Sequence, residues 1–142
     1  MGMADLTVTP ASVIPSASAV IAIGTAGATI VAGQTLYVDT ANSNVLKLYD
    51  ADGSALTSTM AGIALGGAAS GQQVRYVTQD PALVLGCTMA VGDTLWGSDT
   101  AGGITATFAD LEAGDYVTCI GVCTVINSTI NFKMIPAGAV KA

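Results

Sequence analysis

The sequence predicts an all-β protein, and three observations carry this prediction. Short runs rich in β-branched residues recur along the 142-residue chain, separated by Gly, Asp, Asn and Ser, which favour turns. In the clearest run, residues 129–135, the apolar Ile130, Phe132 and Met134 alternate with polar residues, as in a strand with one buried face. No segment shows a sustained 3.6-residue apolar period between helix caps. We therefore expect a single compact β-sandwich or barrel, residues 17–142, preceded by an extended N-terminal arm, residues 1–16.

The arm is predicted from its prolines. Pro10 and Pro15 remove amide donors and favour extended backbone in the residue before them. Four apolar residues of the arm would be wasted on a free chain: Leu6, Val8, Val13 and Ile14. They either pack back on the domain or add a strand to the sheet edge of a neighbouring protein, and the sequence leaves both alternatives open.

Nine runs in the β domain are predicted as strands: residues 29–31, 35–39, 45–49, 62–65, 73–78, 94–96, 104–108, 116–125 and 129–135. The run 116–125 is apolar on both faces, as expected of a strand with protein on either side. Asp52-Gly53 follows the third run and predicts a hairpin turn. Residues 109–112 can form one helical turn at most, because Gly114 would stop it.

A repeated turn supports the all-β prediction. Residues 29–37 and 88–96 match in sequence, and Asp-Thr-Ala follows shortly after each. The shorter theme of a small residue, Gly, Gln or Asp, any residue and an apolar residue also occurs at 70–74 and 113–117. Each glycine can take the positive φ of a turn that starts a strand. The repeat leaves open a fold of two related halves.

Composition and charge exclude several classes of function. Charged residues make up 10% of the chain and the net charge is −6, with four scattered cations: Lys47, Arg75, Lys133 and Lys141. Binding to nucleic acid depends on a basic patch, so we expect no nucleic-acid partner. The chain has no His, which excludes Ser-His-Asp triads and His-ligated zinc. A surface with so few charges is expected to be covered in part by other protein.

No membrane or secretion signal is expected. The longest apolar stretch, residues 17–32, is interrupted by Gly and Thr and falls short of the roughly 20 apolar residues that span a bilayer. No Lys or Arg precedes Lys47, so the basic region of a signal peptide is missing. We expect synthesis in the cytoplasm and no membrane partner.

Cysteines and carboxylates are expected to be structural. Cys119 and Cys123 would lie too far apart in a strand to form a disulfide, and with Cys87 they are expected to be buried thiols. Most aspartates stand next to Gly, Pro or Thr, where Asp stabilises turns. Residues 50–54 differ from a calcium loop because Gly stands at the fourth place. We therefore expect no enzyme, no catalytic residue, no metal site and no cofactor.

Aromatic residues are few, at 5% of the chain. Trp96 with Tyr37, Tyr49 and Tyr76 could form a platform for stacking on a sugar. Packing in a core or an interface is the expected role of so small a set.

Several glycine-anchored motifs resemble those of small head decoration proteins, also called cement proteins, of tailed bacteriophages. The central motifs are Ala61-Gly-Ile-Ala-Leu65, Gly71-Gln-Gln-Val-Arg-Tyr76, Gly92-Asp-Thr-Leu-Trp96 and Ala101-Gly-Gly-Ile104. Others lie near the end of the chain, at 109–111, 114–117, 120–122 and 135–138. The similarity extends over residues 28–142. The sequence is compatible with a jelly-roll, a β-tulip and a simple barrel alike, because strand order is not readable from one sequence.

The resemblance implies a structural role in the virion. Proteins of this family are typically homotrimers on the outer capsid surface, where they clamp neighbouring major capsid proteins, and they have no catalytic residues. We therefore expect this chain to bind the major capsid protein from outside, with Leu6, Val8, Val13 and Ile14 as first contacts. Deleting residues 1–16 is then expected to leave the domain folded and to abolish capsid binding. An acidic chain also suits the outside of a DNA-filled shell, because it would repel the genome from within.

The alternative is a receptor- or carbohydrate-binding module of a phage tail fibre or surface appendage. Such a module would need an exposed aromatic platform, and Trp96 would be its central residue.

Overall fold

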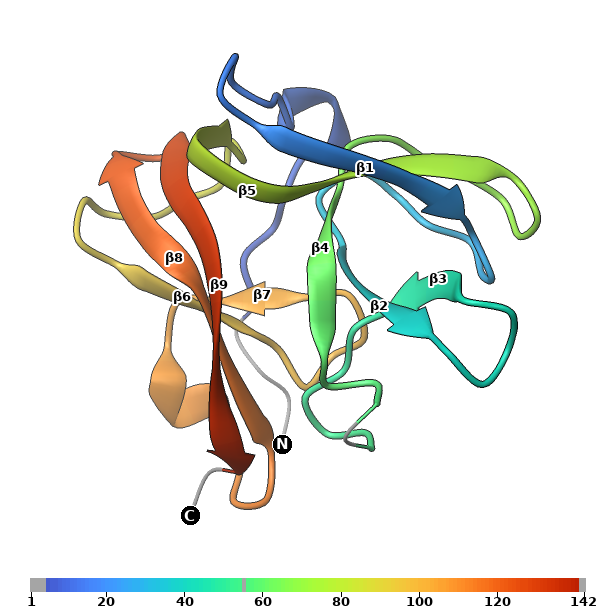
Figure 1. Ribbon diagram of the computed structural model, residues 1–142. Coiled ribbons are helices and arrows are strands. Elements are labelled where there is room, and N and C mark those ends of the chain that lie inside the picture. The colour runs from blue at the N-terminus through green and yellow to red at the C-terminus, as the bar shows by residue number, and fades with distance from the viewer. Residues whose placement is uncertain (1–4, 55, 141–142) are drawn as a thin grey trace.

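The described part of the chain forms a single curled antiparallel sheet of nine strands, without an α-helix (Figure 1). The structure is a computed structural model that describes residues 5–54 and 56–140. The strands are β1 Val20–Thr25, β2 Thr35–Asp39, β3 Val45–Leu48, β4 Met60–Ala64, β5 Gln73–Val84, β6 Thr94–Gly97, β7 Ile104–Thr105, β8 Tyr116–Val125 and β9 Thr129–Val140. Two short 3-10 helices complete it: η1 Pro10–Ser12 and η2 Phe108–Asp110. The prediction of an all-β fold is confirmed.

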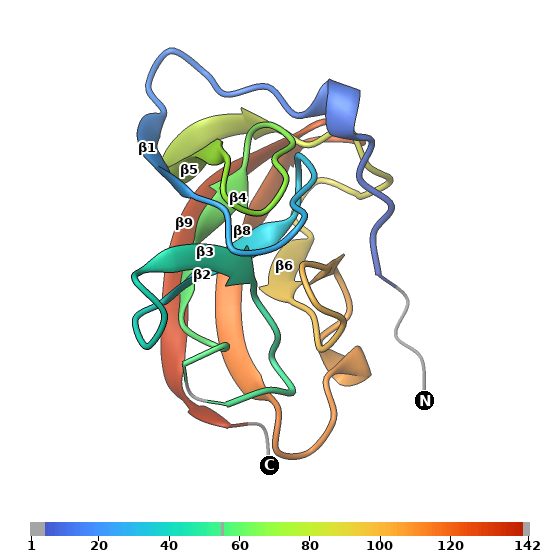
Figure 2. The same cartoon turned by 90° about the vertical axis from the view of Figure 1, so that its right-hand side faces the viewer.

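The strand order in the sheet is β3-β2-β4-β5-β9-β8-β6-β7, and β1 pairs with β5 outside this path. The sheet curls into a half-barrel, which Figures 1 and 2 show from two sides. Its concave side holds the main core, whose fully buried side chains include Ile63, Leu83, Leu95, Ile120 and Phe132.

Two predicted strands coincide with the observed ones, β2 and β8, whereas others differ. β1 was not predicted, and the predicted run 29–31 contributes only an isolated bridge from Ile30 to Ala68. The run 104–108 ends as a strand at Thr105, and the helical turn expected at 109–112 overlaps η2, which begins one residue earlier and ends at Asp110. The hairpin predicted at Asp52-Gly53 is wrong, because β2, and not β3, pairs with β4, and these two residues lie in a longer loop.

The sheet consists of two halves with the same strand arrangement. β2 lies between β3 and β4, and β6 lies in the same way between β7 and β8. The β2–β4 pair and the β6–β8 pair each have a register shift at the same place. Leu36 pairs with Gly62 directly before the first shift, and Leu95 pairs with Gly121 directly before the second. The two patterns coincide when residue numbers are shifted by 59, since 36 becomes 95 and 62 becomes 121.

Backbone hydrogen bonds repeat with the same shift. Gly33 N donates to Ala64 O over 2.8 Å, and Gly92 N donates to Cys123 O over 2.9 Å. The pairing of β1 with the first part of β5 corresponds in strand order to the pairing of the second part of β5 with β9. Val20 faces Gln79 and Gln79 faces Lys133, so the first partner is shifted by 59 residues and the second by 54. The two related halves that the sequence left open are therefore present, and β5 belongs to both.

The repeated turn has one geometry at all four places. The glycine φ values are 91°, 90°, 92° and 95° at Gly33, Gly71, Gly92 and Gly114, which is the left-handed region that only glycine adopts readily. In each turn the Gln or Asp after the glycine accepts a hydrogen bond from the amide three residues earlier, at 2.8 or 2.9 Å. Gln and Asp are interchangeable here because both offer a side-chain oxygen to that amide.

Gly62 is required for a different reason, namely the close approach of β5. A methyl group at Gly62 would overlap the carbonyl oxygen of Val77, and one at Gly121, its counterpart, would overlap that of Asn131. At Gly66, where φ is not positive, a methyl group would meet no atom within 4 Å. Of these three glycines, Gly62 and Gly121 therefore allow the close spacing of neighbouring strands, and Gly66 does not contribute to it.

We expect Gly62→Ala to lower the free energy of unfolding by about 3 kcal/mol, since the backbone oxygen of a central strand cannot move aside cheaply. Gly66→Ala is the matched control and should change the free energy of unfolding by less than about 0.5 kcal/mol. Urea denaturation of the three proteins measures the difference. Equal stabilities of the two variants would contradict the proposed role of Gly62.

Candidate functional site

The N-terminal arm, expected to be the site of partner binding, packs along the chain's own sheet (Figure 2). Leu6 N donates to Ile104 O on β7 over 2.7 Å. Ile14 and Val84, at the end of β5, exchange two hydrogen bonds of 3.0 Å. On its other side, Ile104 pairs with β6 and Val84 pairs with β9. The arm therefore pairs with strand edges that would otherwise be open.

The four apolar residues of the arm have different surroundings. Val13 is buried in the main core, and Leu6 and Val8 are half-buried against it. Ile14 is 55% exposed. Of the two alternatives that the sequence left open, packing back on the domain is the one that the described part of the arm, residues 5–16, adopts. Residues 1–4 of the predicted arm lie outside the described residues.

Ser16 and Asp80 tie the end of the arm to β5. The Asp80 carboxylate is fully buried and accepts hydrogen bonds from Ser16 N at 2.7 Å, from Ala82 N at 3.0 Å and from the Ser16 hydroxyl. Burial acts to raise the pKa of Asp80, but these hydrogen bonds outweigh it and hold the pKa below its ordinary value. The carboxylate is therefore charged at neutral pH and anchors the arm.

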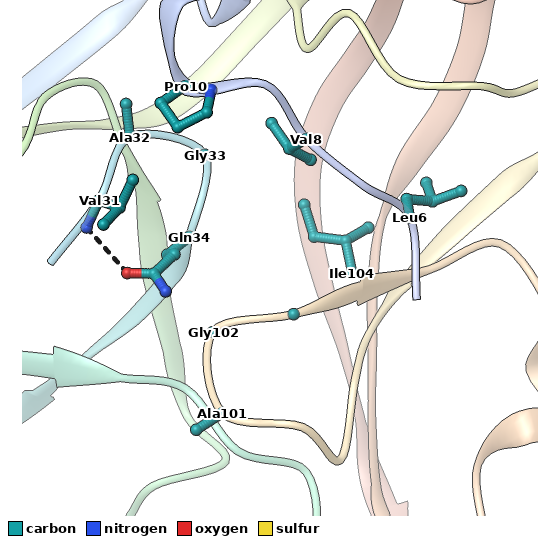
Figure 3. A pocket seen from close by; sticks show the side chains of 11 residues that line it. Leu6, Val8, Pro10, Val31, Ala32, Gly33, Gln34, Ala101, Gly102 and Ile104 are labelled. Carbon is teal, nitrogen blue, oxygen red and sulfur yellow. Dashed lines mark hydrogen bonds between the residues drawn. The ribbon is translucent and has the colours of Figure 1, made fainter. Parts of the chain in front are cut away.

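A pocket of about 270 Å³ lies between the arm and two turns of the domain (Figure 3). Leu6, Val8 and Pro10 form its arm side, and residues 31–34 and 101–104 form the opposite side. Its lining has no charged side chain, and the Gln34 Oε1 atom accepts a hydrogen bond from Val31 N at 2.8 Å. The pocket can hold an apolar side chain, but it offers no group that would perform chemistry.

Large aliphatic side chains are exposed in several places. The exposed large hydrophobic residues are Ile14, Val20, Ile21, Ile23, Val31, Val91, Phe108, Val122, Val125, Ile126 and Ile135. They lie on the arm, on β1, in the turns before β2 and before β6, on η2, on β8 and its hairpin with β9, and on β9. Large exposed apolar side chains therefore occur on several sides of the domain.

The sequence pointed to the arm and missed most of these residues. Their signal was available: Val91 stands in a turn beside Gly92, and Ile126 stands in the turn after β8, directly before Asn127, which has a φ of 54°. β-branched residues are poor turn formers, so their presence in turns indicates a role other than folding.

The carboxylates gather around Asp99. Burial, and then the charges of Asp115, Glu112, Asp52 and Asp5, raise the pKa of Asp99 from 3.8 to about 6. Within residues 5–54 and 56–140, no group of three or more His, Cys, Asp or Glu side chains is arranged to hold a metal ion.

The aromatic residues do not share one open face. Tyr37 and Tyr49 are buried, and the Tyr49 hydroxyl lies 3.2 Å from the Thr118 hydroxyl. Trp96 packs edge-on against Phe108, with ring centroids 4.9 Å apart. Two of the four residues considered for sugar stacking are therefore closed to a ligand.

The three cysteines are free thiols. Cys87 and Cys123 are buried, Cys119 is half-buried, and burial raises the pKa of all three. A raised pKa lowers the fraction of thiolate, so these groups are poor nucleophiles at neutral pH.

Comparisons with protein-family models, with curated proteins and with solved structures found no match to this chain. Among the described residues, no helix is long and apolar enough to cross a membrane.

We expect the free energy of unfolding to rise when the pH is lowered from about 7.5 to about 5. The pKa of Asp99 is higher in the folded than in the unfolded chain, so the folded state takes up the proton first and the cost of the charge is relieved below about pH 6. Asp80 has the opposite shift, and its stabilisation is lost only when the pH falls below its ordinary pKa.

Asp99→Asn should raise the free energy of unfolding at about pH 7.5 and remove most of the gain on acidification. Urea denaturation at the two pH values measures both effects. A variant that gains as much stability at low pH as the original chain would show that another group is responsible.

Proposed function

We propose that this chain is a capsid decoration protein, which binds the outer surface of a phage head as a homotrimer and stabilises the shell by bridging major capsid proteins. The observation that carries the proposal is the exposure of large aliphatic side chains on several sides of a small β domain. A protein that bridges subunits needs apolar contacts on more than one side, whereas a single-ligand module needs one site. The glycine-anchored motifs that resemble this family support the same proposal.

The scarcity of charge also supports it. Burying a charged side chain at an interface is costly unless it is paired, and only 10% of this chain is charged. Weak contacts repeated over a symmetric shell add up to strong attachment. Binding only to the mature spacing of the shell would stabilise that state by the difference in affinity between the two states.

The first test is the copy number of the chain in purified virus particles, by quantitative mass spectrometry. We expect near-stoichiometric amounts relative to the shell protein. A few copies per particle would place the chain in a tail or fibre, and absence from particles would overturn the proposal.

The structure changes how the arm has to be tested. Deleting residues 1–16 would uncover the main core around Val13 and open the edges at Val84 and Ile104, so loss of binding would not separate contact from misfolding. Of the four predicted contacts, Ile14 alone is exposed and can meet a partner without rearrangement.

We expect Ile14→Asp to weaken attachment to purified heads by at least about tenfold while the fold remains intact, because a buried charge without a partner costs several kcal/mol. Ser70→Asp is the control, since Ser70 is exposed, lies in the turn before β5 and is not among the exposed large hydrophobic residues. Co-sedimentation with heads that lack the chain measures attachment. Unchanged binding of Ile14→Asp would remove the arm from the interface.

A further inference from the structure

The two equivalent turns of the halves, residues 31–34 and 90–93, differ in what covers them. The first turn is covered by the arm: Ala32 and Gly33 are buried, and a methyl group at Gly33 would lie 2.5 Å from Val8 Cγ1 and 3.2 Å from Val13 Cγ2. The second turn has no such cover. A methyl group at Gly92 would meet no atom within 4 Å, and Val91 is 65% exposed.

The second turn lies beside the β8–β9 hairpin, and both expose apolar side chains. Asn127 N donates to Met89 O over 3.0 Å, and Gly92 N donates to Cys123 O over 2.9 Å. These two bonds set a register that brings Val91 opposite residues 124 and 125. Val125 and Ile126 are 50% and 61% exposed, so Val91, Val125 and Ile126 form a patch, called here the tip patch.

The surroundings of the tip patch carry no charge. Residues 86–92 and 121–132 contain no Asp, Glu, Lys or Arg. The nearest carboxylate along the chain, Asp93, accepts a hydrogen bond from Ala90 N at 2.9 Å and so serves its own turn. A partner on this surface would need no charged group and would have no charge to desolvate.

We propose that the tip patch binds an extended, uncharged apolar segment of a partner protein, in the way that the equivalent first turn binds the arm. The arm shows which chemistry this kind of turn accepts. It is an extended chain with branched aliphatic residues at alternate positions, Leu6 and Val8, followed by Pro10. The segment that fits the tip patch has the same composition.

The segment comes from another protein rather than from this chain or a second copy. The chain's own arm already lies on the first turn, where Val13 is buried in the main core. An arm moved to the tip patch of a neighbour would uncover Val13 and leave the edges at Val84 and Ile104 unpaired. The binding site itself is argued from the two turns alone, and only an identification of the partner with a shell protein rests on the proposed function.

The test is an NMR titration of the isotope-labelled chain with a synthetic peptide that has the sequence of residues 6–15, as a model uncharged apolar segment. We expect saturable shifts of amide signals in 89–93 and 123–127. Shifts confined to 31–34, Val84 and Ile104 would mean that the peptide only displaces the arm and would overturn the proposal. The absence of saturable shifts up to about 1 mM peptide would overturn it as well.

Val91→Asp and Ile126→Asp should each weaken peptide binding by at least about tenfold, because each places a charge in the apolar contact. Both positions are exposed, so one variant serves if the other fails to fold. Val20→Asp is the control and should bind as the original chain does. Peptide affinity that is the same in all variants would show that the tip patch is not the site.

The titration contains no virus particle, and its result is therefore separate from the proposed function. Binding of the peptide at the tip patch, together with absence of the chain from particles, would support the proposed binding site and overturn the proposed capsid role. Abundance of the chain in particles without binding of the peptide would support the proposed capsid role and overturn the proposed binding site.

Discussion

The structure depends on how the open edges of its curled sheet are satisfied. Unpaired backbone groups at a strand edge invite association with other chains unless they are covered. In the first half, Ala26, directly after β1, forms a parallel bridge to Leu46 on β3, and Gly27 N donates to Leu46 O over 2.8 Å. In the second half, the corresponding strands, the end of β5 and β7, each bond to the arm instead. The arm is therefore a structural part of the sheet.

This division limits where a partner can bind. Leu6, Val8 and Val13 serve the domain itself, so a partner that used them would first have to replace the arm. Ile14 and the tip patch serve no such purpose, and neither does β1, where Ile21 and Ile23 are exposed. These side chains contribute nothing to the core, so they are available for contacts outside the chain.

The sequence predicted strands where apolar residues alternate or where a repeated turn starts them, as at β2 and β8. It failed where tertiary pairing decides. β5 was expected to end before Pro81, which lacks an amide donor, yet a register shift between Asp80 and Leu83 lets the strand continue past it. β1 contains Gly24 and no polar alternation, so neither period marks it as a strand. The packing of the arm could not be predicted, because the strand edges that it pairs with, on β5 and β7, are formed by residues far away in the chain.

Comparison of the two halves separates residues that their shared strand arrangement, called here the frame, requires from residues that it does not require. Gly62 and Gly121 occupy equivalent positions and meet the same obstacle, a carbonyl oxygen of the next strand, so both are fixed by the frame. Ala32 and Val91 are equivalent as well, but one is buried beneath the arm and the other is exposed. The frame thus tolerates a small or a large residue at this position, and its own stability does not explain a valine in solvent. Since only one of these two equivalent positions is exposed, the side chain of Val91 is available for contact outside the chain.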